Sequence, residues 1–129
     1  MYSKPGLKSM ASKERTEPMQ TIKEMTPFEV PAGRDEEFLK GWNVAAERTR
    51  HAWGLRSIQL YESLDPETKF RFVAVSEWES ALHYEAARSL VKRALEELRA
   101  AMPFAAYAAS YRLVVSAAGT LPAHELFSR

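Results

Sequence analysis

The fold is indicated most clearly by the stretch Phe70-Arg71-Phe72-Val73-Ala74-Val75-Ser76-Glu77-Trp78-Glu79-Ser80. Its first nine residues have the alternating pattern of a β-strand, and both faces of that strand are apolar. The two faces are formed by Phe70, Phe72, Ala74 and Trp78, and by Val73 and Val75. A strand of this kind is usually central in its sheet and covered on both sides. Ser80 is a suitable N-cap, so a helix is expected to follow.

The remaining segments predict two helices and three further strands. The strands are expected over Met19–Phe28, Leu55–Leu64 and Tyr107–Val115, and the helices over Asp35–Ala52 and from Ser80 to Pro103. Because Pro27 cannot donate to a sheet ladder, it is expected near the end of its strand. The order β-α-β-β-α-β predicts an α+β, ferredoxin-like fold with an antiparallel four-stranded sheet.

Both helices carry an apolar face with helical spacing. In the first helix this face contains Phe38, Trp42, Ala45, Ala46, Thr49 and Trp53; in the second it contains Ala87, Leu90, Val91, Ala94, Leu95, Leu98 and Met102. Acidic residues crowd the start of the first helix and basic residues its end, which suits the helix dipole. Gly54 is a natural stop signal for that helix.

The ferredoxin-like plan leaves one face of the sheet without helices. In this sequence that face would carry several apolar residues, and an exposed apolar patch predicts a partner. A second copy packed face to face would close a dimeric α/β barrel. We therefore expect a homodimer that forms through the open sheet face.

A chain of 129 residues suits one domain with tails. We expect a polar N-terminal tail or arm over residues 1–18, the domain over residues 19–115, and a C-terminal tail over residues 116–129. The net charge of +1 and the lack of a basic run give no footprint for nucleic acid or for a membrane surface. No apolar run is long enough for a membrane helix or a signal peptide. A cytoplasmic protein is expected.

The sequence offers few metal or cofactor signals. With no cysteine, disulfides, thiolate nucleophiles and cysteine-ligated metals are excluded. The histidines His51, His83 and His124 are too far apart in sequence to suggest a metal site. The five glycines are isolated, so no phosphate-binding loop is expected. We therefore predict neither a metal nor a bound cofactor.

Aromatic and polar residues gather at the ends of the predicted elements, where a cavity between helices and sheet could form. The candidates for this cavity are Trp42, Asn43, Tyr61, Phe72, Ala74, Trp78, His83 and Tyr84. Four of them also have a plainer interpretation. The tryptophans would serve equally as core, His83 as a solvated or capping residue of the second helix, and Tyr84 as buried filler.

Four segments together resemble the antibiotic biosynthesis monooxygenase (ABM) domains. They are Phe28–Arg34, the Leu64–Pro66 turn, Phe70–Val73 and Glu77–Ser80, and the resemblance spans about Met19 to Val115. It implies the same dimeric α+β barrel. It also implies a possible activity, because characterised members oxidise polycyclic phenols or anthrones to quinones with dioxygen and need no metal, flavin or other cofactor.

The resemblance further implies particular pocket residues. The family has a tryptophan at the end of the third strand and a tyrosine six residues later, which correspond here to Trp78 and Tyr84. It also has an asparagine four residues before the tryptophan, where this chain has Ala74. Alanine cannot supply the side-chain hydrogen bond that would stabilise a substrate oxyanion. Haem-degrading relatives have an asparagine on the first strand, which this chain lacks, so haem degradation is the weaker reading.

Two hypotheses follow for function. The leading one is a cofactor-independent monooxygenase in which Tyr84 orients an aromatic, quinol-like substrate, Trp78 shapes the pocket and His83 is the candidate base. The alternative is a non-catalytic dimer that binds a small ligand or a partner on the same scaffold, which Ala74 favours. Turnover that Tyr84→Phe abolishes would separate the first from the second.

Overall fold

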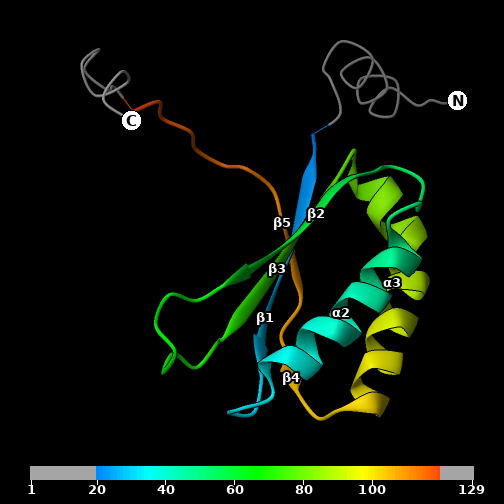
Figure 1. Cartoon of the computed structure of the whole chain (residues 1–129). Helices are drawn as coiled ribbons and strands as arrows, with labels where there is room; N and C mark the ends of the chain where they lie inside the picture. Colours follow the sequence, from blue (N-terminus) through cyan, green and yellow to red (C-terminus); the bar gives the residue numbers. More distant parts are fainter. Residues whose placement is uncertain (1–19, 120–129) are drawn as a thin grey trace, which may run out of the picture.

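The structure of this protein is a computed structural model that describes residues 20–119. Two helices lie side by side on one face of a single antiparallel sheet (Figure 1). The elements in chain order are β1 Ile22–Glu29, α2 Asp35–Thr49, β2 Leu55–Glu62, β3 Phe72–Trp78, α3 Ala81–Ala101, β4 Ala105–Ala106 and β5 Ala109–Tyr111. The predicted tail over residues 1–18 lies outside the described residues, as does most of the predicted C-terminal tail.

The sheet has the strand order β2-β3-β1-β4, and β5 pairs with β1 beyond β4. The strand that the sequence predicts to be central forms β3, and β1 and β2 flank it on either side. The predicted ferredoxin-like α+β fold is therefore confirmed. Among the described helices, none is both long and apolar enough to cross a membrane.

Side chains alternate between the two faces of the sheet. On β1 the row Glu24, Thr26 and Phe28 faces the helices and is buried. Met25 lies between them on the opposite face, where it is paired with Val75 of β3. This alternation decides which residues of β1 can reach a site under the helices.

The core lies where α2, α3 and the sheet meet. Its buried members are Phe28, Phe38, Phe72, Leu98 and Met102. Phe38 of α2 packs between the two strands, with its ring centroid 4.9 Å from that of Phe28 and 5.1 Å from that of Phe72. These aromatic contacts hold the N-terminal part of α2 against the sheet. A cavity between this helix and the sheet must therefore lie nearer the C-terminal end of α2.

Several helices and strands are shorter than the sequence predicts. The first helix ends at Thr49 rather than Ala52, because the chain turns into Gly54, whose φ of 83° is a left-handed conformation. The second strand ends at Glu62 rather than Leu64, and the third begins at Phe72 rather than Phe70. In both strands the turn between them takes up the residues that were assigned to the strand.

The last strand differs most from its prediction. Instead of a continuous strand over Tyr107–Val115, two short strands pair with β1 at separate places. The break faces Pro27, which is paired with β3 on one side and has no N–H to offer on the other. Its carbonyl still accepts a hydrogen bond from the Tyr107 N–H at 3.1 Å. Beyond Tyr111 the described chain leaves the sheet as an extended arm (Figure 1).

Candidate functional site

A narrow cavity lies between the helices and the sheet. Its volume is about 50 Å³, and most of its lining is apolar. The lining comes from β1, α2, β2, β3 and α3 and includes Trp42, Ile58, Ala74, Val91 and Leu95. An engineered cavity of about 150 Å³ is known to hold a benzene molecule. We call this space the inner cavity; its volume is too small for an aromatic ring.

A larger depression opens beside the inner cavity. We call it the vestibule; its volume is about 540 Å³, and it is lined by Glu24, Tyr84, Glu85, Arg88, Ser89, Val91, Lys92, Leu95 and Ala108. Glu24, Val91 and Leu95 belong to both linings, so the two spaces meet at these side chains. An aromatic compound could occupy the vestibule and present one edge to the inner cavity.

A chain of hydrogen bonds runs along the boundary between these spaces. The Tyr84 hydroxyl donates to Glu24 Oε2 at 2.9 Å. The Ser76 hydroxyl lies 3.5 Å from Glu24 Oε1 and accepts from Trp78 Nε1 at 3.0 Å. The chain therefore links α3, β1 and β3 through four side chains.

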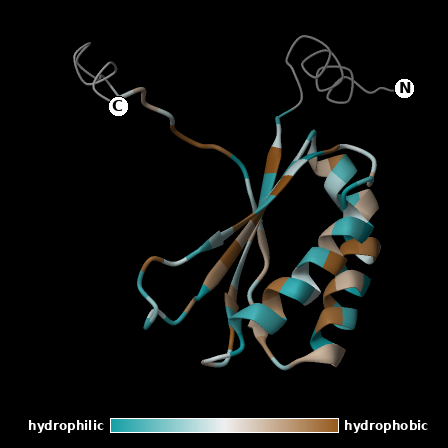
Figure 2. Ribbon diagram, in the orientation of Figure 1, coloured by the Kyte–Doolittle hydropathy of each residue, from teal (hydrophilic) through white to brown (hydrophobic). Residues whose placement is uncertain are grey.

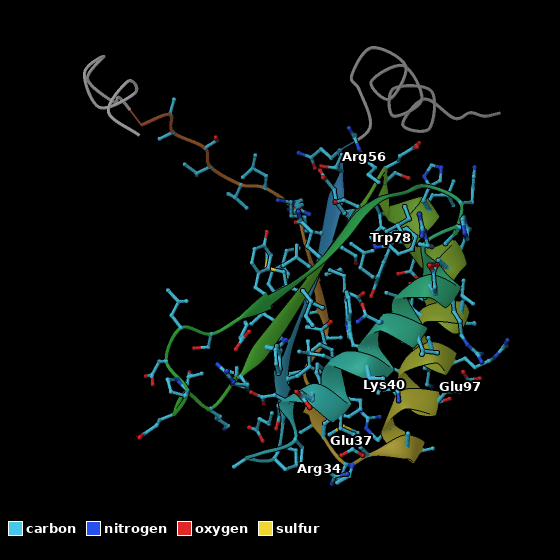
Figure 3. The ribbon with its side chains drawn as sticks, viewed as in Figure 1. Arg34, Glu37, Lys40, Arg56, Trp78 and Glu97 are labelled. Carbon is cyan, nitrogen blue, oxygen red and sulfur yellow. The ribbon has the colours of Figure 1, made fainter. Side chains whose placement is uncertain are left out.

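Trp78 and Tyr84, the residues that correspond to the family pair, are in contact. Their rings pack edge to face with centroids 5.9 Å apart. Trp78 is 1% exposed and lies between the sheet and the helices (Figure 3). Since it lines neither cavity, it can fix the position of Tyr84 and Ser76 but does not itself reach the vestibule.

Burial changes the pKa values of two members of this chain of hydrogen bonds, Glu24 and Tyr84. It raises the pKa of Glu24, although hydrogen bonds from Tyr84 and Ser76 and the nearby Arg88 act in the opposite direction. Burial also raises the pKa of Tyr84 to about 12, assisted by the negative charge of Glu24. Tyr84 is thus held as a neutral phenol, and Glu24 is easier to protonate than an ordinary carboxylate.

His83 is placed away from both cavities, although the sequence made it the candidate base. Its Nδ1 lies 2.7 Å from the hydroxyl of Ser80, the N-cap of α3. Its ring lies 4.0 Å from that of Trp53 and is close to Gly54. These contacts tie the start of α3 to the loop after α2, which is a structural role.

The other candidates divide into two groups. Trp42 and Ala74 line the inner cavity. Phe72 is buried in the aromatic core, Asn43 is exposed on α2, and Tyr61 lies on the open face of the sheet with 54% of its surface exposed. The structure therefore places Trp42 and Ala74 in the inner cavity and pairs Trp78 with Tyr84, which lines the vestibule, and it leaves the remaining candidates elsewhere.

Sequence reasoning missed Glu24 and Arg88. Glu24 was not among the candidates, because it stands beside the charged Lys23 in the first strand. Strict alternation with Thr26 and Phe28 would have placed it on the covered face. Arg88 lies one helical turn after Tyr84 on α3 and pairs with Glu85 at 3.2 Å.

The described part of the chain holds no cluster of three or more histidine, aspartate or glutamate side chains that could bind a metal ion. The polar groups at the boundary are one carboxylate, one phenol and one hydroxyl, with two cationic side chains in the vestibule. Such a set can bind and orient a phenolic compound and can move a proton.

The chain belongs to the antibiotic biosynthesis monooxygenase family, because the family model matches residues 21–103. This range holds both helices, the strands β1, β2 and β3, and all four side chains that the hydrogen bonds between Tyr84 and Trp78 connect. The resemblance inferred from the four sequence segments is thereby confirmed. No curated protein sequence matches the chain.

Solved structures with the same fold include proteins of differing function. A candidate monooxygenase from Shewanella loihica PV-4 is 24% identical, with a TM-score of 0.65 over 75% of this chain and 97% of that one. SnoaB, a cofactor-independent oxygenase from Streptomyces nogalater, is 17% identical, with a TM-score of 0.60 over 80% and 98%. A haem-degrading protein from Mycobacterium tuberculosis, in haem-free form, is 21% identical, with a TM-score of 0.56 over 78% and 99%. At these identities the likeness establishes the fold alone.

Proposed function

We propose that this protein is a cofactor-independent monooxygenase that oxidises an aromatic, quinol-like compound with dioxygen. The observation that carries the proposal is the edge-to-face pair of Trp78 and Tyr84, whose phenol lines the vestibule and donates a hydrogen bond to Glu24, where the two spaces meet. Membership of the family and the likeness to SnoaB support the reaction type.

The vestibule is the proposed place of substrate binding. There the Tyr84 oxygen can accept a hydrogen bond from a substrate hydroxyl, because its own proton is directed to Glu24. Trp78 keeps the phenol in place from behind. With Ala74 where the family has an asparagine, orientation of the substrate depends more heavily on Tyr84.

The reaction balances without a further reductant. A substrate methylene loses a proton, and the carbanion supplies the electrons that dioxygen needs. A carbon–oxygen bond forms to give a peroxide. The oxygen–oxygen bond then breaks with loss of the second carbon-bound proton, which leaves a carbonyl and one water. The overall change is CH₂ plus O₂ to C=O plus H₂O.

Dioxygen uptake by the metal-free protein tests the proposal, with anthrones and hydroquinones as substrates. We expect uptake by the wild type and a loss of at least about tenfold in Tyr84→Phe, because the substrate is no longer oriented. Tyr107→Phe, an exposed tyrosine outside both cavities, is the matched control and should keep full activity. Binding of these compounds without uptake would support the non-catalytic module instead.

Haem is the second ligand to examine, because the fold is shared with a haem-degrading protein. The inner cavity is far smaller than a haem, and the first strand lacks the asparagine that the resemblance implies for those relatives. We therefore expect no change in the haem absorption spectrum on titration with the protein. A tight, saturable spectral shift would contradict the proposal.

The functional unit is proposed to be a homodimer that forms through the open sheet face. Support comes from apolar side chains that this face and the adjoining arm leave exposed: Tyr61, Tyr111, Leu113, Val114 and Val115. The arm carries a strongly hydrophobic segment where it leaves the sheet (Figure 2).

A further inference from the structure

Glu24 is an acidic residue in a buried row of β1. Only 9% of its surface is exposed, and its neighbours in the row, Thr26 and Phe28, are also buried. Its carboxylate lies where the inner cavity and the vestibule meet. A molecule in the vestibule can therefore contact Glu24 without displacing the core.

Few groups compensate the charge of this carboxylate. It accepts the 2.9 Å hydrogen bond from Tyr84 and a longer one from Ser76, and no ion pair involving it forms among residues 20–119. The charged groups that face the vestibule from α3 are Glu85, Arg88 and Lys92. From α2 and β3, only apolar or hydroxyl-bearing residues face the inner cavity beside it, namely Trp42, Ala45, Ala46, Thr49, Ala74 and Ser76.

This arrangement is costly for a purely structural residue. A buried carboxylate without a cationic partner loses hydration that two hydrogen bonds only partly replace. A glutamine could accept from Tyr84 through its amide oxygen and donate to the Ser76 hydroxyl through its amide nitrogen, without that cost. The carboxylate at this position therefore points to chemistry rather than to packing.

We propose that Glu24 is the base that removes the substrate proton, which His83 cannot reach from its place beside Ser80. This inference rests on the proposed oxygenase function and deepens it. The substrate carbon–hydrogen bond breaks, its electron pair stays on the substrate, and the proton passes to a Glu24 carboxylate oxygen. When the oxygen–oxygen bond later breaks, the same proton passes to the hydroxide released and forms water.

The surroundings of Glu24 suit this cycle. Its raised pKa makes it a better proton acceptor than an exposed glutamate, and general bases work best when their pKa is near the working pH. Tyr84 holds one carboxylate oxygen in place, and Ser76 lies beside the other. The substrate anion that forms would lie near Arg88, whose charge already favours the ionised form of Glu24.

The test isolates proton removal from oxidation. Anthrone is incubated with protein in D₂O without dioxygen, and exchange of its methylene protons is followed by NMR. We expect the wild type to accelerate the exchange and Glu24→Gln to slow it by about a hundredfold or more. Anthrone affinity, measured by tryptophan fluorescence, should change less than about threefold. Glu67→Gln removes the same charge in the exposed β2–β3 turn and should exchange like the wild type.

The possible outcomes separate the two proposals. Wild-type exchange in a folded Glu24→Gln protein overturns the role of Glu24 and leaves the oxygenase proposal intact. The same holds if the wild type consumes dioxygen with anthrone but does not accelerate exchange. If the wild type binds anthrone and neither exchanges its protons nor consumes dioxygen, both proposals fail. Circular dichroism and thermal unfolding of Glu24→Gln show whether the variant is folded.

Discussion

At the scale of single residues, Glu24 and Tyr84 restrict each other's protonation. The carboxylate accepts a hydrogen bond from the phenol, and its negative charge helps burial to raise the pKa of Tyr84 to about 12, so that the phenol stays neutral. The buried position in turn raises the pKa of Glu24. A pair of groups whose acidities are moved by their surroundings is typical of sites where protons are transferred.

The raised pKa of Glu24 has a consequence for stability. The folded protein binds this proton more tightly than the unfolded chain, whose reference pKa is 4.5. The resulting stabilisation is present below that pH and is lost as the pH rises through the folded-state pKa. Glutamine cannot titrate, so Glu24→Gln should be more stable than the wild type at neutral pH by about 1 kcal/mol.

Urea unfolding from pH 4 to pH 8 measures this difference. The gain of Glu24→Gln over the wild type should grow as the pH rises above 4.5 and then level off. Glu67→Gln should show no such trend, because that side chain is exposed. A gain that is constant over the whole range would mean that Glu24 does not titrate abnormally in the folded protein.

The candidate site was only partly accessible from sequence at this scale. Trp78, Tyr84 and Ala74 became candidates through the family resemblance, and Trp42 through its place at the end of a predicted element. Glu24 was missed because a charged pair at the start of a strand looks like a solvated end. Alternation with Thr26 and Phe28 puts its side chain on their face of the strand, but a single sequence does not show that Tyr84 of α3 lies beside it.

At the scale of elements, the connection between α2 and β2 determines where α3 begins. Gly54 has a φ of 83°, and a Cβ built on it would lie 2.3 Å from the His83 ring. The loop and the first turn of α3 are therefore in direct backbone-to-ring contact. This contact explains why His83 is buried although nothing in the cavities uses it.

Gly54→Ala should destabilise the protein through two effects. The left-handed backbone costs about 1–2 kcal/mol for any residue with a Cβ, and the methyl group must also displace His83. Gly33→Ala is the matched control, since Gly33 has a φ of 80° but nothing within 4 Å of the added methyl. We expect thermal unfolding to show a clearly larger loss for Gly54→Ala. Equal losses would mean that the His83 ring moves away freely.

The elements themselves were predictable where periodicity was strong. The second helix, β3 and the element order followed from apolar spacing and from Ser80, which caps α3 by accepting a hydrogen bond from the His83 N–H. The division of the last strand was not predictable, because Tyr107–Val115 has the alternation of a strand throughout. Its division depends on Pro27, which lies eighty residues earlier in the chain and offers β4 and β5 no donor between them.

At the scale of the whole molecule, the two faces of the sheet are unequal. One face is covered by α2 and α3, and neither of these helices lies on the other (Figure 1). The arm beyond β5 exposes 70% of Leu113, 83% of Val114 and 79% of Val115. Apolar side chains exposed in sequence along an extended segment are unfavourable in water, and a second copy would bury them.

We expect the protein to sediment as a dimer of the 14.7 kDa chain at micromolar concentration. Leu113→Asp should raise the dimer dissociation constant at least about tenfold, because the added charge would be buried in the interface. The fold of each subunit should stay unchanged, since the Leu113 side chain is exposed in the single chain. Val44→Asp makes the same kind of change on the outer side of α2, where Val44 is 57% exposed, and should leave the dimer intact. Sedimentation velocity over a concentration series distinguishes these variants. A wild type that is monomeric at 100 micromolar, or a dimer that only Val44→Asp disrupts, would contradict an interface on the open sheet face.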